Sequence, residues 1–197
     1  MTKRPAIDKV ALMKRIFALA LTIFSMTTPA LASTSTGVHP EAVTGFDVNR
    51  YLGDWYEIGT VPQWFQRDCV CTRARYSMGA SERINVLNEC RKKTLDGRID
   101  RARGKARFAT DRKDIGDLEV SFFLWFYGSY RIIELDPDYR YSVVSNDEGT
   151  TFWILSRTPT MDPELIEQIK SRAVEKGLDL SAFRLTPQEG CRALDAQ

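Results

Sequence analysis

The sequence predicts an all-β domain with one helix near its C-terminus, and three observations lead to this prediction. Short apolar or alternating segments recur at hairpin spacing from Gly53 onward. Turn-forming residues separate these segments, as at Asp96-Gly97 and Gly128-Ser129. A single helical pattern follows the last segment, between residues 162 and 177. Eight such strands imply an antiparallel sandwich or an up-and-down barrel.

The predicted strands are 55–61, 72–78, 84–91, 98–109, 118–126, 130–135, 141–145 and 151–156. The fourth is the most informative, because its cations alternate with small or apolar residues. One face carries Arg101, Arg103, Lys105 and Arg107, and the other carries Ala102, Gly104, Ala106 and Phe108. Small residues on the inward face leave space that a solid sandwich core would fill. This strand therefore favours a hollow barrel.

The C-terminal helix has defined ends and one apolar face. Asp162 is a good N-cap, Pro163 fits the first helical position and Gly177 fits the C-terminal cap. The apolar stripe comprises Leu165, Ile166, Ile169, Ala173 and Val174. We expect it to pack against the outside of the barrel. Membrane binding is the weaker interpretation, because the opposite face carries charges of both signs.

Composition limits the functions open to the chain. Its 197 residues include 28 Lys and Arg against 26 Asp and Glu, for a net charge of +2. That balance argues against a strongly basic nucleic-acid-binding protein. The single His, His39, argues against most His-based catalysis, metal binding and haem ligation. We expect no cofactor and no metal, and a single domain over 46–197.

Residues 1–32 are typical of a secretion signal. Met13-Lys14-Arg15 is basic, 16–26 is an apolar run, and Ala30-Leu31-Ala32 has the form of a signal-peptidase site. The run is too short to span a bilayer core of about 30 Å, and a buried core helix is the alternative. Residues 33–45 are expected to be a mobile leader with a solvated His39. No lipoprotein-anchoring Cys follows the cleavage site, so we expect a periplasmic or secreted protein.

After export, the four cysteines would lie where disulfides persist. Cys69-Val70-Cys71 is more closely spaced than most zinc-ligand pairs, and neither a second cluster nor a nearby His completes such a site. Folding the hairpin of the second and third strands brings Cys90 opposite Cys69 and Cys71. One of these two would pair with Cys90 and the other with Cys191. We choose Cys69–Cys90 and Cys71–Cys191.

Three motifs together resemble those of the lipocalin family. Gly53 and Trp55 form the Gly-x-Trp of the opening motif. Residues 135–139 lie where lipocalins carry a second motif, and 153–159 match the third motif, with its Arg at Arg157. Three motifs in order are far more specific than Gly-x-Trp alone. The resemblance covers 46–187, in particular to bacterial outer-membrane lipocalins, plant temperature-induced lipocalins and apolipoprotein D.

The lipocalin resemblance implies an eight-stranded barrel that is closed at one end and has room for one small ligand. It also implies that Arg157 lies across the indole of Trp55 at the closed end, where both are structural. Apolipoprotein D has a Cys five residues before a Tyr of its second strand, paired with a C-terminal Cys. Cys71 and Cys191 match those positions, which supports the pairing chosen above. Bacterial relatives are commonly anchored lipoproteins, and their anchoring Cys is not found here.

A closed apolar cup implies a small hydrophobic ligand, such as a fatty acid or lysophospholipid, that is stored or transported for envelope maintenance or stress. The candidate lining residues are Ala106, Phe108, Val120, Phe122, Tyr130, Ile132, Val143 and Trp153. Each of them could instead be plain core. Trp64, Phe65 and the segment 125–127 are expected at the open rim.

An enzyme built on this barrel, an isomerase or de-epoxidase, is the alternative function. Such chemistry needs a free thiol or a carboxylate inside the cup. Glu57 and Glu134 are the acidic candidates. We favour a protein that binds its ligand without catalysis.

The cations of the fourth strand have two interpretations. Between Arg91 and Lys113 there are ten Lys and Arg residues and only three acids. This stripe could attract anionic envelope lipids in a peripheral contact. Alternatively it is a solvated outer face that discourages edge pairing.

Overall fold

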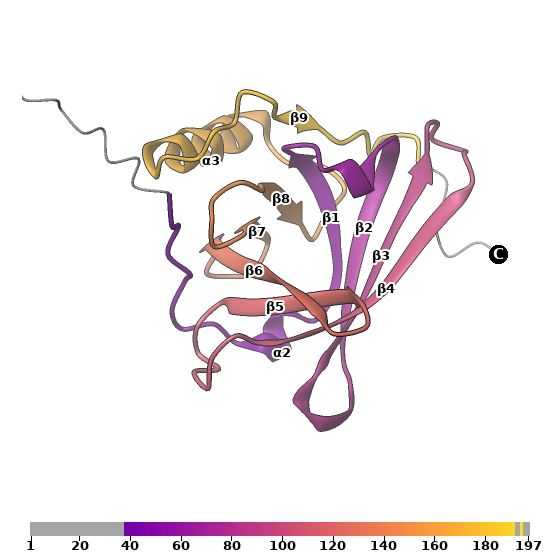
Figure 1. Ribbon diagram of the computed structural model, residues 1–197. Coiled ribbons are helices and arrows are strands. Elements are labelled where there is room, and N and C mark those ends of the chain that lie inside the picture. The colour runs from indigo at the N-terminus through magenta and orange to yellow at the C-terminus, as the bar shows by residue number, and fades with distance from the viewer. Residues whose placement is uncertain (1–37, 192–193, 195–197) are drawn as a thin grey trace, which may run out of the picture. The chain divides into compact units, whose positions relative to one another are not determined.

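A closed barrel of eight antiparallel strands forms the body of the protein in the computed structural model, which describes residues 38–191 and residue 194 (Figure 1). β1 pairs with both β2 and β8, which closes the sheet. The predicted barrel is therefore confirmed over the sandwich. The predicted secretion signal at 1–32 lies outside the described residues. The barrel strands are β1 (Gly53–Thr60), β2 (Cys69–Met78), β3 (Ile84–Lys92), β4 (Ile99–Phe108), β5 (Asp117–Phe123), β6 (Phe126–Leu135), β7 (Tyr141–Ser145) and β8 (Trp153–Ser156).

Alternation along the strands divides the apolar side chains between two cores. The inner core, inside the barrel, includes Trp55, Ile132 and Val144. The outer core lies between the barrel wall and α3 (Pro163–Glu175), and it includes Ile133 and Val143. Neighbours such as Ile132 and Ile133 thus face opposite sides of the wall. The result is an apolar barrel interior and one outer face covered by a helix.

The helix α3 packs on the outside of the barrel, as its apolar stripe predicts (Figure 1). Asp162 caps its N-terminus by accepting a hydrogen bond of 2.9 Å from the backbone N–H of Glu164. Val174 is 55% exposed and does not belong to the buried stripe. It follows Ala173 directly, and one residue turns a helix by about 100°. The buried residues of α3 are Ile166, Ile169 and Ala173.

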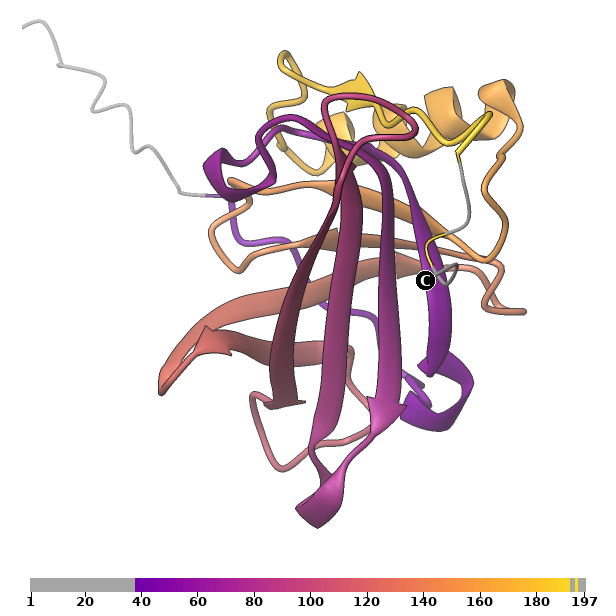
Figure 2. The same ribbon diagram turned by 90° about the vertical axis from the view of Figure 1, so that its right-hand side faces the viewer.

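The β5–β6 hairpin turns earlier in the chain than predicted. Its turn is at Leu124-Trp125, where Leu124 has a φ of 51°. Gly128, expected in a turn, instead pairs with Val120 within the sheet. The prediction was wrong because the turn lies within an unbroken apolar run, where no turn-forming residue marks it. Gly128 lies within strand β6 instead. The hairpin projects beyond its neighbours at the left of Figure 2.

Of the predicted mobile leader at 33–45, residues 38–45 lie along the barrel instead, and 33–37 lie outside the described residues. The backbone N–H of Val43 donates to the carbonyl of Ile132 at 2.8 Å, and Gly116 donates to the carbonyl of Val43 at 2.9 Å. Val43 also packs against the inner core, so burial of this side chain holds the segment in place. The short helix α2 (Val48–Tyr51) then leads into β1.

The C-terminal segment is fastened beside β1 and β2. β9 (Arg184–Leu185) pairs with the end of β1, where β1 no longer pairs with β2. Two disulfides, Cys69–Cys90 and Cys71–Cys191, link the chain in the pairing chosen from the sequence. Short 3-10 turns, η1 (Trp64–Gln66) and η2 (Ala80–Glu82), lie in the β1–β2 and β2–β3 connections. Within the described residues, no helix has the length and apolar character needed to cross a membrane.

Candidate functional site

The two ends of the barrel differ in how they are covered. β1 begins directly after α2, so α2 marks one end. Since the strands alternate in direction, the β1–β2, β3–β4, β5–β6 and β7–β8 connections all lie at the opposite end. We call the α2 end the floor and the opposite end the mouth of the cup.

Arg157 and Trp55 lie together at the floor. The guanidinium carbon of Arg157 is 3.8 Å from the centroid of the Trp55 ring, a cation–π distance. The Trp55 indole N–H donates to the carbonyl of Tyr51 in α2 at 2.8 Å. Gly53 has a φ of +96°, which favours glycine, and a Cβ there would lie 3.3 Å from Nη1 of Arg157. The guanidinium also donates to the carbonyl oxygens of Arg50, Asp54 and Tyr139 at 2.6, 2.9 and 3.3 Å.

Most of the predicted lining residues belong to the inner core. Two of them, Ala106 and Ile132, are fully buried there. The others are partly buried and pack against the same core. The predicted residues that the structure brings together inside the barrel are Ala106, Phe108, Val120, Tyr130, Ile132 and Trp153.

Two predicted lining residues do not belong to the inner core. Val143 packs in the outer core beneath α3, and its neighbour Val144 faces the interior instead. The sequence 141–145 is apolar on both faces, so alternation alone does not assign the side. Phe122 is 43% exposed, and its ring lies 2.8 Å from where a Cβ on Gly104 would stand. By strand register it shares the inward face with Ala106 and Val120, nearer the mouth.

A cluster of tyrosine hydroxyls near the floor was not predicted. The Tyr130 hydroxyl lies 2.8 Å from those of both Tyr51 and Tyr76, and the Tyr51 hydroxyl lies 3.1 Å from Oγ of Ser142. Burial raises the pKa of Tyr51 to about 12 and also raises the pKa values of Tyr76 and Tyr130. These groups are therefore neutral hydroxyls at pH 7. They give an otherwise apolar interior a polar anchor point.

Glu57 is a buried carboxyl group that ties the mouth to the C-terminal segment. One of its oxygens accepts from Gln66 of η1 at 2.8 Å, and the other accepts from the Thr186 hydroxyl at 2.5 Å. Gln66 in turn accepts from the Trp153 indole at 2.9 Å. Burial raises the pKa of Glu57, while the hydrogen bonds and nearby Arg184 partly oppose that rise. Both oxygens are thus engaged in holding neighbouring segments.

Glu134 and the cysteines do not supply reactive groups to the cup. The register shift in β6 between Ile132 and Glu134 turns Glu134 to the outside, contrary to its predicted place. There it accepts from Arg172 of α3 at 2.6 and 3.1 Å and from Tyr141 at 2.9 Å. These bonds lower its pKa despite the opposing effect of burial. All four cysteines are in disulfides.

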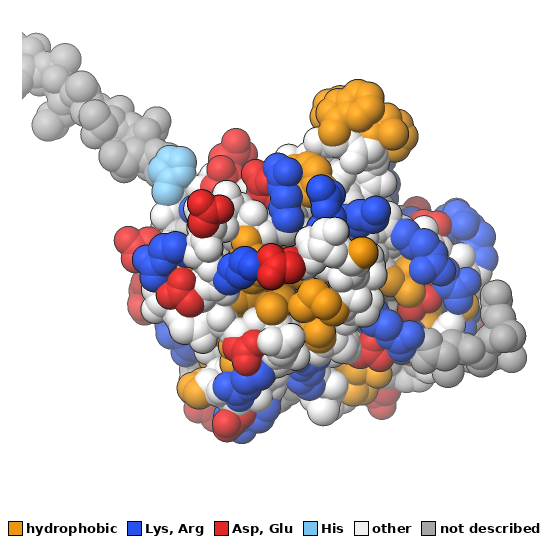
Figure 3. Space-filling model, turned by 90° about the horizontal axis from the view of Figure 1, so that it is seen from below, with side chains coloured by type: hydrophobic (Ala, Val, Ile, Leu, Met, Phe, Trp, Pro, Cys, Tyr) orange, Lys and Arg blue, Asp and Glu red, His pale blue; other side chains and the backbone are white. Residues whose placement is uncertain are grey.

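Exposed apolar side chains gather at the mouth. Trp64 and Phe65 lie in the β1–β2 connection, 79% and 54% exposed. The tip of the β5–β6 hairpin adds five consecutive exposed residues, at 122–126. Figure 3 shows hydrophobic side chains collected on a projection at the margin of the molecule. Of the predicted rim aromatics, Trp64, Phe65, Trp125 and Phe126 are thus exposed, whereas Tyr127 is half-buried.

The cations of β4 differ in how they are compensated. Arg101 donates to Glu89 at 2.7 Å, and Arg107 lies 2.6 Å from Glu119. Arg103 and Lys105 are exposed and have no ion pair or hydrogen bond within the described part of the chain. The stripe is therefore only half neutralised by neighbouring acids.

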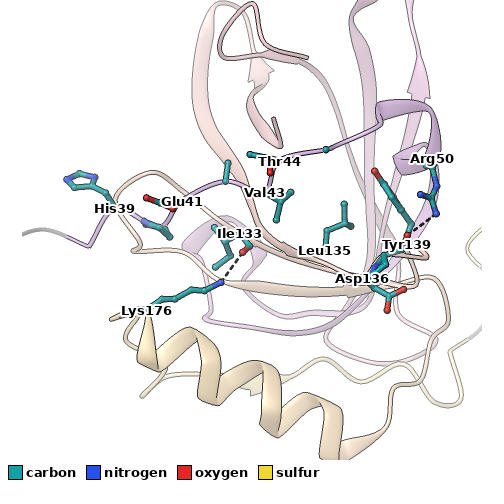
Figure 4. A pocket seen from close by; sticks show the side chains of 14 residues that line it. His39, Glu41, Val43, Thr44, Arg50, Ile133, Leu135, Asp136, Tyr139 and Lys176 are labelled. Carbon is teal, nitrogen blue, oxygen red and sulfur yellow. Dashed lines mark hydrogen bonds between the residues drawn. The ribbon is translucent and has the colours of Figure 1, made fainter. Parts of the chain in front are cut away.

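A groove lies beside the barrel wall rather than inside the barrel. It has a volume of about 800 Å3, and the segment 39–45, the end of β6 and Lys176 line it (Figure 4). Lys176 donates to the carbonyl of Ile133 at 3.1 Å, and Arg50 donates to that of Pro137 at 3.0 Å. His39 lies at its edge and contacts the carbonyl of Asp147 at 2.9 Å. No cluster of three or more His, Cys, Asp or Glu side chains suited to a metal ion occurs among the described residues.

The floor formed by Arg157 and Trp55 and the apolar interior define an eight-stranded β-barrel, an architecture that can hold one small ligand. A lipocalin-like domain family model matches residues 46–188. The chain belongs to this family.

Several known proteins are similar to this chain. Temperature-induced lipocalin-1 of Arabidopsis thaliana is 36% identical over 156 residues, which cover 75% of this chain and 82% of that protein. The outer membrane lipoprotein Blc of Escherichia coli K12 is 38% identical over 148 residues, with the same coverage. Apolipoprotein D of Mus musculus is 33% identical over 162 residues, which cover 77% and 82%.

Solved structures support the fold. Apocrustacyanin C2 superposes with a TM-score of 0.57 at 18% identity, covering 73% of this chain and 81% of that one. Insecticyanin from the tobacco hornworm Manduca sexta superposes with a TM-score of 0.56 at 18% identity, covering 74% and 82%. At this identity the likeness concerns the barrel alone.

Proposed function

We propose that the protein binds a lipid with a long apolar chain, such as a fatty acid or lysophospholipid, in the cup and stores or carries it without catalysis. The observation that supports this most is the apolar inner face of the barrel, where Phe108, Val120 and Trp153 are only partly buried, above the floor formed by Arg157 and Trp55. Burial of apolar surface contributes about 25 cal/mol per Å2. Ordering of the ligand offsets much of that gain, so affinities in the micromolar to nanomolar range are expected.

The thiol and carboxyl groups considered for an enzyme are engaged elsewhere in the structure. A thiol nucleophile would need a free cysteine, and all four are in disulfides. Glu134 faces α3, and both oxygens of Glu57 already accept hydrogen bonds. A general acid or base must reach the reacting group of the substrate. These placements favour a carrier.

We further propose that the protein works after export, in the periplasm or outside the cell, in envelope maintenance or stress. Two disulfides suit an oxidising compartment. The sequence features of residues 1–32 suit a secretion signal. One of the relatives is named as an outer membrane lipoprotein, which agrees with an envelope role.

Native mass spectrometry of protein purified from a bacterial periplasm tests the carrier proposal. A co-purifying lipid is expected, and it should be displaced by added palmitate. Val120→Asp places a charge on the cup wall and should weaken palmitate binding by at least about tenfold, because an unpaired charge is costly in apolar surroundings. Val174→Asp, on the exposed face of α3, is the matched control and should bind normally. An empty barrel that takes up no palmitate would overturn the proposal.

A further inference from the structure

The β5–β6 hairpin presents a contiguous apolar surface to solvent. Phe122, Phe123, Leu124, Trp125 and Phe126 are 43–72% exposed. Single exposed apolar residues are ordinary in soluble proteins, but a contiguous patch of large side chains marks an interaction surface. The hairpin also projects from the barrel (Figures 2 and 3). This shape suits insertion into a partner better than contact between two flat faces.

Unpaired cations lie beside this tip. Lys105 of β4 is the register partner of Ser121, and continuing that register places Arg103 across from Phe123. Neither cation has an ion pair or hydrogen bond among the residues that the structure describes. The apolar tip is therefore bordered on its β4 side by uncompensated positive charge.

Two further arginines contact Tyr127, next to the apolar tip. Arg83 donates to the Tyr127 hydroxyl at 3.0 Å, and Arg107 lies 4.1 Å from the centroid of the same ring. The acids Asp147 and Glu148 belong to the β7–β8 connection, where the Asp147 N–H donates to Ser129. They lie along β6, on the side of the hairpin away from β4. Approach from the β4 side thus meets the exposed Arg103 and Lys105, while Arg107 is paired with Glu119.

A side chain of the hairpin also hydrogen-bonds backbone carbonyl groups at its tip. The Ser121 hydroxyl, nearly buried, lies 3.4 and 3.3 Å from the carbonyl oxygens of Phe123 and Leu124. Backbone carbonyls without partners are costly to transfer out of water. A tip that engages its own carbonyls loses less on entering an apolar phase.

We propose that this hairpin docks the protein onto an anionic phospholipid bilayer. Its apolar tip enters the interfacial layer, and Arg103 and Lys105 contact the headgroup phosphates. Apolar insertion combined with cations is the general basis of peripheral membrane binding. Because Trp64 and Phe65 lie at the same end of the barrel, docking turns the mouth of the cup toward the bilayer. This surface lies outside the cup, so its test needs no bound ligand and can fail or succeed independently of the carrier proposal.

Flotation with phosphatidylcholine vesicles, with and without phosphatidylglycerol, tests the docking surface. The full-length exported protein should float with the anionic vesicles, and added salt should weaken the binding. The double variant Phe123→Ser/Trp125→Ser should reduce binding by at least about tenfold. Arg103→Gln and Lys105→Gln should each reduce it by about fivefold. Val174→Ser, which removes another exposed apolar side chain, from α3, should leave binding unchanged.

Depth of insertion provides a second measurement. Bromine-labelled lipids should quench tryptophan fluorescence in the docked protein. Trp125→Phe should remove most of that quenching while the protein still floats. Equal flotation of the Phe123→Ser/Trp125→Ser variant and the unchanged protein would overturn the proposal. So would a dimer in lipid-free solution that this variant abolishes, because the tip would then cover a second copy of the chain.

Discussion

Arg157 joins the floor of the barrel through one side chain. Its guanidinium lies over Trp55 and donates to backbone carbonyls of α2, β1 and the β6–β7 connection. Burial lowers its pKa, and nearby Tyr51 and Asp54 oppose that effect. The planar guanidinium group of arginine can stack on the ring and donate to three carbonyls at once, whereas the ammonium group of lysine cannot. The residue therefore stabilises the junction of three segments.

Arg157→Lys is expected to lower the free energy of unfolding by about 2–4 kcal/mol, since it keeps the charge but loses charge-assisted hydrogen bonds and stacking. Urea denaturation measures this. Arg140→Lys is the control, because Arg140 forms an ion pair with Asp136 but its side chain is 74% exposed. Equal losses in the two variants would contradict a special role for the floor arginine.

Glu57 should give the protein a specific pH dependence. Its pKa is raised in the folded state, so the folded protein holds the proton more tightly than the unfolded chain does. The resulting stabilisation is complete below the ordinary glutamate range, about 4.3. It is lost as the pH rises from there through the raised folded pKa. Glu57→Gln mimics the protonated carboxyl group and removes this loss.

The measurement is the free energy of unfolding of Glu57→Gln minus that of the unchanged protein, across pH. This difference should grow as the pH rises from about 4 to 8. Glu89 and Asp136 have lowered pKa values, which change stability with pH in the opposite direction. Their contribution is the same in both proteins, so it cancels in the difference. Glu167→Gln, on exposed α3, should show no such trend. A difference that shrinks with pH would refute a raised pKa at Glu57.

Sequence motifs located some of these residues and missed others. Gly53, Trp55 and Arg157 stand in recognisable motifs, and the structure brings them together. The hydroxyl cluster of Tyr51, Tyr76 and Tyr130 joins residues up to 79 positions apart. No local sequence pattern predicts this contact, because it depends on how the barrel closes. Long-range contacts of this kind need the register of every intervening strand.

At the scale of elements, the C-terminal segment acts as a strap across the end of the β1–β2 pairing. The Cys71 N–H donates to the carbonyl of Pro187 at 2.9 Å. The Gln188 amide donates to the carbonyls of Glu57 and Thr72, each at 2.8 Å. The Cys71–Cys191 disulfide then fixes the end of the strap to β2. The strap thus takes over part of the role of strand pairing at this seam.

Removal of the Cys71–Cys191 disulfide by paired alanine substitutions should cost more stability than removal of Cys69–Cys90. Their sequence separations are 120 and 21 residues. The chain-entropy model gives about 5 and about 3 kcal/mol. Loss of the longer link should also expose the strap to proteases, with cleavage mapped by mass spectrometry. Equal stability losses and an uncleaved strap would show that hydrogen bonds alone hold it.

The elements themselves were largely predictable, because alternation and turn residues mark each strand. The face of the sheet to which each side chain points was harder to predict where a strand is irregular. The register shift between Ile132 and Glu134 turns two consecutive residues, Ile133 and Glu134, to the outside. A period of two does not allow for that extra residue. Val143 was misplaced for a related reason, since its strand is buried on both faces.

At the scale of the whole molecule, the apolar barrel interior and the groove along 39–45 are the two alternative places for a ligand. The cup has an apolar lining from the inner core. The groove along 39–45 is bordered by charged groups, including Arg50, Asp136 and Lys176. An apolar chain gains most where it leaves water completely. The cup is therefore the favoured site for a lipid, and coupling between binding and stability distinguishes the two.

A ligand that binds only the folded protein stabilises it by mass action, by about 2.7 kcal/mol at a free concentration of 100 times Kd. For a domain of this size, that corresponds to a rise in Tm of about 5–10 °C. Palmitate should produce such a rise in the unchanged protein and in Val174→Asp, but not in Val120→Asp, whose charge lies on the cup wall. If Val120→Asp showed the full rise, palmitate would be bound outside the cup. A charge reversal in the groove, Lys176→Glu, would then test that site, and it should leave the rise unchanged if the cup holds the chain.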